Sequence, residues 1–226
     1  MYRERASRVP GGYVWSSLST GNVVRVLPDG CMDLLWDGHE ILVAGPDTHA
    51  QLFHSEAGTT MTGLRFAPGY APRVLGVPAS EFTDDRVALD AIWSPTRVRE
   101  VTDAVAASED PSATLETVAL GRASELDTDA ALVEEIAALA RAGHNSTTIA
   151  SRVGFSTRQL QRRSTAAFGY GTKTLARVLR MQRALAIARR GNPPADTAAR
   201  AGYADQSHLA RDVKAMAGVP LGALLG

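Results

Sequence analysis

Two segments near the C-terminus decide the fold: residues 146–160 read STTIASRVGFSTRQL, and residues 196–211 read DTAARAGYADQSHLAR. In each, an alanine stands four residues before a glycine. This spacing suits a helix-turn-helix, in which the two helices cross too closely for a larger side chain. The glycines, Gly154 and Gly202, suit the turn because they lack the Cβ that disfavours its conformation. The sequence therefore predicts two helix-turn-helix units in one chain.

Between the two units lies a stretch with the composition of one long helix. Thr172–Arg190 combines apolar residues with five arginines, and Gly191 and the prolines that follow end the helix. About 19 residues at 1.5 Å each give a rod of about 28 Å. Such a rod can hold two recognition helices about one DNA turn apart, roughly 34 Å, so that both enter successive major grooves.

In the first unit, Ser156 is the expected N-cap of the second helix, and Leu160 and Phe168 point inward. The outward residues opposite Leu160 follow the i, i+3, i+4, i+7 spacing of one helix face. They are Arg158, Gln161, Arg162 and Thr165. Arg and Gln are the side chains that read guanine and adenine edges in the major groove. The alternative is an ordinary solvated helix face, which the turn spacing disfavours.

In the second unit, Asp205 is the expected N-cap and Leu209 the inward residue. The outward residues are Gln206, Ser207, His208 and Arg211. For His208 two interpretations stay open, a packing histidine or a DNA contact, whereas Arg211 favours a DNA contact.

The charge distribution supports a polyanion partner for the C-terminal half. Residues 1–140 contain 10 Lys and Arg against 21 Asp and Glu, a net charge of −11, whereas residues 141–226 contain 14 against 3, a net charge of +11. A basic half joined to an acidic half is typical of a nucleic-acid-binding domain attached to a domain that does not bind nucleic acid.

The N-terminal half shows short, strand-like runs between Gly, Pro, Asn and Asp turns. They are Tyr13–Leu18, Val23–Leu27, Cys31–Trp36, Glu40–Ala44, Ala50–His54 and Thr60–Phe66. Six such strands predict a small, cupin-like β-barrel or sandwich. Two helices opened by proline, Pro95–Ala106 and Pro111–Gly121, trail behind it, and an amphipathic helix over Asp129–Ala142 follows.

We therefore predict an α+β protein of two domains, with an all-α C-terminal domain in which a long helix joins the two units. The expected boundaries are residues 1–122 for the β-rich sensor or dimerisation domain, 123–128 for an acidic, polar linker and 129–226 for the DNA-binding domain.

The strand around Met32 carries the candidate effector pocket. Its period of two places Met32, Leu34 and Trp36 in the core, and Cys31, Asp33 and Leu35 on a mixed face that fits a wet surface better than a cavity. A pocket would take aromatic walls with a charged anchor. Its candidate residues are Trp15, Cys31, Asp33, Trp36, Phe53 and Arg65, with Phe66 as a further wall. The competing interpretation of the aromatic residues is plain core.

The C-terminal part, from about residue 129 to 225, resembles the AraC/XylS family of bacterial transcription regulators. The resemblance rests on VGFSTRQLQR (153–162), FGYGTKTL (168–175), LRMQRAL (179–185) and AGYADQSHL (201–209). It implies base contacts from Arg158, Gln161 and Arg162 in the first unit and from Gln206, Ser207, His208 and Arg211 in the second. We expect contacts with the DNA backbone from Ser156, Thr157, Thr165, Lys173, Arg177 and Arg180. The chain departs from the family pattern at Ser164, Thr172, Thr197, Val213 and Met216, which predicts a less aromatic core and a looser second unit.

The N-terminal part resembles the small sensor-type domain of one branch of that family, through LPDGCMDLLW (27–36), AGPDT (44–48) and LRFAPGYA (64–71). The resemblance implies an effector or dimerisation domain and names no effector. The expected partners are double-stranded promoter DNA and an unknown small-molecule effector. Contact with RNA polymerase and formation of a homodimer are further expectations.

Several function classes are disfavoured. The single cysteine, Cys31, excludes an internal disulfide and a multi-thiolate zinc site. The sequence lacks a membrane span and a signal peptide, so we expect a cytoplasmic protein with no membrane partner. We expect no cofactor, no metal and no enzymatic activity.

Two alternatives stay open. One is a metal-dependent cupin-type enzyme fused to a DNA-binding domain, with His39, His49, His54, Asp33 and Asp47 as available ligands, although no pair has close spacing on one strand. The other is Cys31 as a redox sensor, which needs an exposed thiol near a cation.

Overall fold

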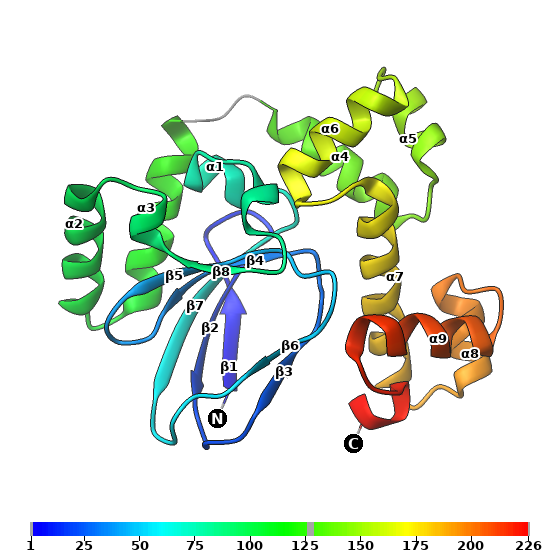
Figure 1. The fold of residues 1–226 in the computed structure, drawn as a ribbon, viewed down its shortest axis with the longest axis horizontal. Coiled ribbons are helices and arrows are strands. Elements are labelled where there is room, and N and C mark those ends of the chain that lie inside the picture. Colours follow the sequence, from blue (N-terminus) through cyan, green and yellow to red (C-terminus); the bar gives the residue numbers. More distant parts are fainter. Residues whose placement is uncertain (1, 126–128, 226) are drawn as a thin grey trace.

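The computed structural model describes residues 2–125 and 129–225, and it consists of a β-rich N-terminal part followed by helices (Figure 1). The strands are β1 (Tyr2–Ala6), β2 (Tyr13–Leu18), β3 (Val24–Val26), β4 (Met32–Trp36), β5 (Ile41–Ala44), β6 (Gln51–Phe53), β7 (Thr60–Phe66) and β8 (Arg86–Ala88). The α-helices are α1 (Ala71–Leu75), α2 (Pro95–Ala106), α3 (Pro111–Glu125), α4 (Ala130–Arg141), α5 (Ser146–Arg152), α6 (Thr157–Phe168), α7 (Thr172–Ala188), α8 (Pro194–Ala201) and α9 (Gln206–Ala217). Short 3-10 turns occur at Ala79–Phe82, Leu89–Ala91 and Leu221–Leu224. The predicted α+β organisation is confirmed.

The strands form an open sheet rather than the closed barrel that the sequence allowed. Six antiparallel strands follow the order β1-β2-β7-β4-β5-β8, and β3 pairs only with β6 in a separate ribbon. All six predicted strands are present, and β2 and β7 have their predicted bounds. The sequence did not predict the two edge strands. In β1 all five side chains are exposed, so no apolar alternation marks it, and β8 has only three residues.

One face of the sheet forms the N-terminal core. Val14 and Leu34 both lie opposite Leu64 of β7, so that three neighbouring strands present buried side chains at one level. Helices α1, α2 and α3 lie on this side of the sheet and contribute to the same core (Figure 1). Met32 and Trp36 are buried there too, which confirms the predicted core face of this strand.

The opposite face of β4 is less wet than expected. Leu35 is buried, and Asp33 lies opposite Arg65 of β7, with 3.5 Å between Oδ1 and Nε. The expectation of a solvated face is wrong for this strand, because the neighbouring strand supplies a cation directly across from the carboxylate.

The N-terminal arm, which contains Arg5, Ser7 and Arg8, is attached to α3 by the buried carboxylate of Glu116. It accepts hydrogen bonds from the hydroxyl of Ser7 and the N–H of Arg8, both at 2.7 Å, and from the guanidinium of Arg5 at 3.3 Å. Burial alone would raise the pKa of Glu116, but these donors outweigh it and lower the pKa to about 2.

In the C-terminal part, α7 supplies side chains to two separate cores. Leu175 and Leu179 belong to a core with α4, α5 and α6, whereas Val178, Met181 and Leu185 belong to a core with α8 and α9. The predicted connecting helix is therefore confirmed, and it is the rod to which both helix pairs are attached (Figure 1).

The proposed domain boundaries stay a prediction. Helix α3 continues through residues 123–125 of the expected linker, beyond the predicted end at Gly121, and residues 126–128 lie outside the described residues.

Candidate nucleic-acid interface

The first helix-turn-helix consists of α5 and α6. Asn145 caps α5 by accepting from the N–H of Thr148, and Ser156 caps α6, where its side chain and that of Gln159 form a capping box. Gly154 adopts φ +72° in the turn between the helices, as the sequence predicts. These local bonds fix where α6 begins and thereby which side chains point away from the core.

The outer face of α6 is open. Arg158, Gln161 and Arg162 are exposed, opposite the buried Leu160 and Phe168, as helical spacing predicts. Among the described residues, neither arginine is in an ion pair, whereas Gln161 Nε2 donates to Thr165 Oγ1 at 3.3 Å. The two guanidinium groups are therefore available to a ligand outside the chain.

The second unit, α8 and α9, repeats this arrangement. Asp205 caps α9 by accepting from the N–H of His208 at 2.6 Å, and Gly202 ends α8 at φ +87°. Gln206, Ser207 and Arg211 are exposed. The two predicted N-caps, Ser156 and Asp205, are both confirmed.

His208 packs within the second unit. Its ring lies edge-on to Tyr203, with 5.1 Å between ring centroids, and its Nδ1 lies 3.5 Å from the N–H of Ala204. The ring therefore packs against its own unit, and a contact of His208 with DNA stays a prediction.

The positions at which the second unit departs from the family pattern are buried. Thr197 is fully buried, and its hydroxyl donates to the carbonyl of Asn192 at 3.3 Å. Val213 and Met216 are also buried, in the core that α7, α8 and α9 share. The threonine hydroxyl therefore has an acceptor inside the unit, and the expectation of a looser second unit stays a prediction.

Two of the residues expected to contact the DNA backbone have partners inside the chain. Arg177 and Arg180 of α7 both form ion pairs with Asp212 of α9, a carboxylate that is almost fully buried. The hydroxyl of Tyr203 donates to the same carboxylate at 3.1 Å. The guanidinium of Arg180 lies 4.5 Å from the centroid of the Tyr203 ring. Burial raises the pKa of Tyr203 to about 12, and the charge of Asp212 adds to the shift.

This cluster was missed by sequence reasoning, although a signal was present. Asp212 is one of only three acidic residues among the 86 residues from 141 to 226. A lone carboxylate in a basic helix indicates an internal partner. The other expected backbone contacts, Ser156, Thr157 and Lys173, lie on the exposed surface, and Thr165 is half-buried.

The candidate effector pocket is only partly assembled. Trp15 Nε1 donates to Asp33 at 2.7 Å, Arg65 lies 3.5 Å from both Asp33 and Asp29, and the N–H of Cys31 donates to Asp29. Trp36 points into the core on the other face of the sheet, and Phe53 stacks on Arg86. The six residues therefore do not surround one cavity.

The environment of Cys31 disfavours a reactive thiolate. Burial raises the pKa of the thiol well above its usual value, and the carboxylates of Asp29 and Asp33 raise it further.

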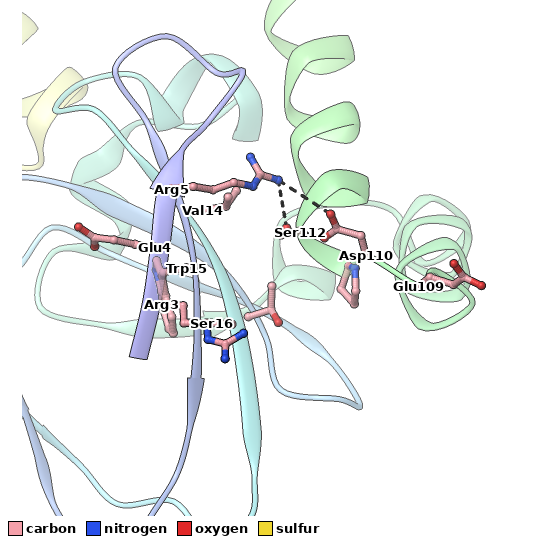
Figure 2. Close-up of a pocket in the computed structure, with 11 residues that line it drawn as sticks. Arg3, Glu4, Arg5, Val14, Trp15, Ser16, Glu109, Asp110 and Ser112 are labelled. Atoms are coloured by element: carbon pink, nitrogen blue, oxygen red, sulfur yellow. Dashed lines mark hydrogen bonds and ion pairs between the residues drawn. The ribbon is translucent and has the colours of Figure 1, made fainter. Parts of the chain in front are cut away.

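Two of the hollows formed by the described residues have volumes of about 410 Å³ each. The first lies between β1, β2 and the start of α3, and Figure 2 shows Arg5 linked there to Ser112 and Asp110. It shares only Trp15 with the predicted pocket. The second lies between α1 on one side and α4 and α6 on the other, with walls from Pro72, Val77, Leu132, Val133 and Ala167.

Two further features concern membranes and metals. No helix within residues 2–125 and 129–225 has the length and apolar character to cross a membrane. In the same described residues, no three His, Cys, Asp or Glu side chains are grouped so that they could hold a metal ion.

Comparisons with known proteins agree with this organisation. Residues 149–225 match the family model of a helix-turn-helix domain, and residues 13–88 match that of a domain of unknown function (DUF6597). No curated protein matches the sequence.

Among solved structures, an apo variant of ToxT from Vibrio cholerae is similar with a TM-score of 0.52 at 13% identity, over 97% of this chain and 98% of that chain. Wild-type ToxT with an unsaturated fatty acid bound has a TM-score of 0.50 at 12% identity, over 99% and 94%. A probable AraC family regulator from Rhodopseudomonas palustris is 21% identical over 42% of this chain and 94% of that chain, with a TM-score of 0.37. The chain thus has an AraC-type helix-turn-helix domain in its C-terminal region and an N-terminal domain of a family of unknown function, and the helix-turn-helix domain supports a DNA-binding transcription regulator.

Proposed function

We propose that this chain is a one-component regulator that reads two successive major grooves of promoter DNA, one with α6 and one with α9. The observation that carries the proposal is the open face of α6, where Arg158 and Arg162 are exposed on a capped helix without an ion pair in the described chain. Exposed Gln206 and Arg211 repeat the pattern on α9. Regulators of this type are not normally enzymes.

The proposed roles follow from these environments. Arg158, Gln161 and Arg162 read base edges in one groove, and Gln206, Ser207 and Arg211 read the next. Lys173, Ser156 and Thr157 contact phosphates, which position the protein without reading sequence. Arg177 and Arg180 act indirectly, because they hold α7 against α9 through Asp212. We assign His208 to the support of α9 rather than to a base.

The test is a selection of duplexes from random DNA, followed by gel shifts of the enriched duplex over a series of salt concentrations. Affinity is expected to fall steeply with salt, because bound arginine and lysine release counterions. Joint replacement Arg158→Ala and Arg162→Ala is expected to weaken binding at least about thirtyfold, at ~1 kcal/mol or more for each contact. Arg99→Ala, at an exposed position on α2, is the matched control. Unchanged affinity of the double variant would overturn the assignment.

We further propose that a small-molecule effector enters the hollow between α1 and the α4–α6 pair, or that N-terminal dimerisation takes its place. The supporting observation is that its apolar walls come from both the sensor side, Pro72 and Val77, and the DNA-binding side, Leu132 and Ala167. One ToxT structure contains an unsaturated fatty acid, so such an acid is a suitable first probe. Leu132→Trp, which fills the hollow, is expected to abolish any response of DNA binding to the probe.

A further inference from the structure

We propose that the loop of residues 45–50, here named the strut loop, fixes the position of the two recognition helices relative to each other and so sets which spacing of grooves the protein accepts. The inference rests on the proposed two-groove function and adds positioning residues that touch no DNA. The strut loop belongs to the N-terminal part, between β5 and β6, yet its two ends lie against different helix-turn-helix units.

The first end of the strut loop contacts the end of α6. Gly169, which terminates α6 at φ +80°, lies directly beside the ring of Pro46, since a Cβ on this glycine would stand 2.5 Å from Pro46 Cγ. The neighbouring Thr83 donates its hydroxyl hydrogen to the carbonyl of Gly169 at 3.0 Å. The recognition helix of the first unit therefore ends on the N-terminal part.

The second end contacts the end of α9. The N–H of Ala50 donates to the carbonyl of Met216 at 2.6 Å, and the guanidinium of Arg25 in β3 donates to the carbonyl of Ala217 at 2.8 Å. The last carbonyls of a helix have no partner inside it. Here the N-terminal part supplies donors for two of them, so the second recognition helix is also fastened to the strut loop.

The strut loop itself is held rigidly. Asp84 accepts from both the N–H and the hydroxyl of Thr48, each at 2.6 Å, and Arg86 binds Asp47 through two hydrogen bonds of 2.9 and 2.8 Å. Gly45 leaves no room for a side chain, because a Cβ would overlap the carbonyl of Phe82. The conformation of the strut loop is thus specified at Gly45, Asp47 and Thr48, through contacts with the segment of residues 82–86.

Asp84 is the key to this rigidity. Its φ of +60° makes it the one non-glycine residue with a positive φ among the described residues. A side chain disfavours this conformation, and such outliers persist only where the surroundings hold them. The surroundings here are the two bonds from Thr48 and the contact of the Asp84 carboxylate with His49 Nδ1 at 3.2 Å.

Within the C-terminal part, the single helix α7 joins the two units. The strut loop adds a second connection between them. With the strut loop, the ends of α6 and α9 are also tied through the N-terminal part, which restricts rotation of one unit about α7 relative to the other. Successive major grooves lie about 34 Å apart, and one inserted base pair rotates the second groove by about 35°. Two units held in a fixed relative position therefore discriminate between DNA sites with different groove spacing. Two loosely joined units would tolerate a change in this spacing.

The experiment uses the full chain and the duplex obtained by selection, together with versions that have one base pair inserted or removed between the two contacted grooves. The wild type is expected to lose about tenfold or more in affinity on either change, in the range of one mismatched contact. In Asp84→Gly, which keeps the backbone conformation but removes the carboxylate, this penalty is expected to fall below about threefold. Affinity for a duplex with one groove site intact should not change.

Thr48→Val provides a second variant that removes only a hydroxyl and should reduce the penalty in the same direction. Thr96→Val on the exposed face of α2 is the matched control and should behave like the wild type. Asp84→Asn keeps an acceptor and is expected to restore part of the discrimination. Suppose that a folded Thr48→Val or Asp84→Gly variant loses as much affinity as the wild type when one base pair is inserted or removed. The proposed role of the strut loop would then be refuted, while the two-groove function would stand. If selection enriches no duplex, the proposed function itself fails.

Discussion

Arg180 of the connecting helix α7 lies 3.4 Å from the Oδ2 atom of Asp212 on α9. This ion pair attaches the connecting helix to the recognition helix of the second unit. The carboxylate also receives Arg177 and the hydroxyl of Tyr203. The position of α9 therefore depends on a carboxylate that is itself buried.

Asp212→Ala should destabilise the second unit. The change leaves two cations and a buried hydroxyl without their acceptor, and because the side chains of Arg177 and Arg180 are 42% and 32% exposed, we expect a loss of only about 1–3 kcal/mol. Thermal unfolding of the full chain measures it. Asp196→Asn, at an exposed position of α8, is the control and should change little. An unaltered melting temperature for Asp212→Ala would contradict the role of the pair.

Glu116 predicts an acid-sensitive attachment of the N-terminal arm. Its pKa falls from an ordinary 4.5 to about 2 on folding, so the carboxylate stabilises the fold fully above pH 4.5 and loses this effect as the pH drops towards 2. The contribution is about 2 kcal/mol, because Arg5 and Arg8 are half exposed and their charges are screened. Denaturant unfolding from pH 6 to pH 3 should show a steeper decline for the wild type than for Glu116→Gln. Parallel curves would refute the assignment.

The local features of the fold were predictable from the sequence, whereas the features that depend on distant contacts were not. The caps Ser156 and Asp205, and the turns at Gly154 and Gly202, were predicted correctly because each depends on bonds within a few residues. The exposure of Arg158 and Arg162 followed from helical period alone.

Features that depend on distant contacts were not predictable in this way. Arg177 had the pattern of a phosphate contact, and only the packing of α9 on α7 brings Asp212 to it. The motif at 44–48 was visible in the sequence, but its Pro46 lies against Gly169, and the nearby Ala50 donates to Met216, both more than 100 residues away. Edge strand β1 was missed because its side chains face solvent.

Lys173 and Arg177 should differ in their effect on the salt dependence of DNA binding, although they are four residues apart on one helix. Lys173 is exposed near the start of α7, so Lys173→Ala is expected to reduce the slope of log affinity against log salt by about 1. Arg177 is already paired with Asp212, so Arg177→Ala should leave the slope nearly unchanged and lower thermal stability instead. Gel shifts at four or more salt concentrations distinguish them. Equal loss of slope in both variants would place Arg177 on the phosphates.

His208 and Arg211 provide the corresponding comparison on α9. Because the His208 ring packs edge-on against Tyr203, His208→Ala should reduce stability by about 1 kcal/mol, in the range of an aromatic pair, and leave the selected DNA sequence unchanged. Arg211→Ala should retain stability and relax the preference at one base pair, by about 1–3 kcal/mol. Selection from random DNA with each variant, alongside thermal unfolding, separates the two effects. A changed base preference for His208→Ala with unchanged stability would show that the histidine reads DNA, and the support of α9 would then have to come from the Asp212 cluster alone.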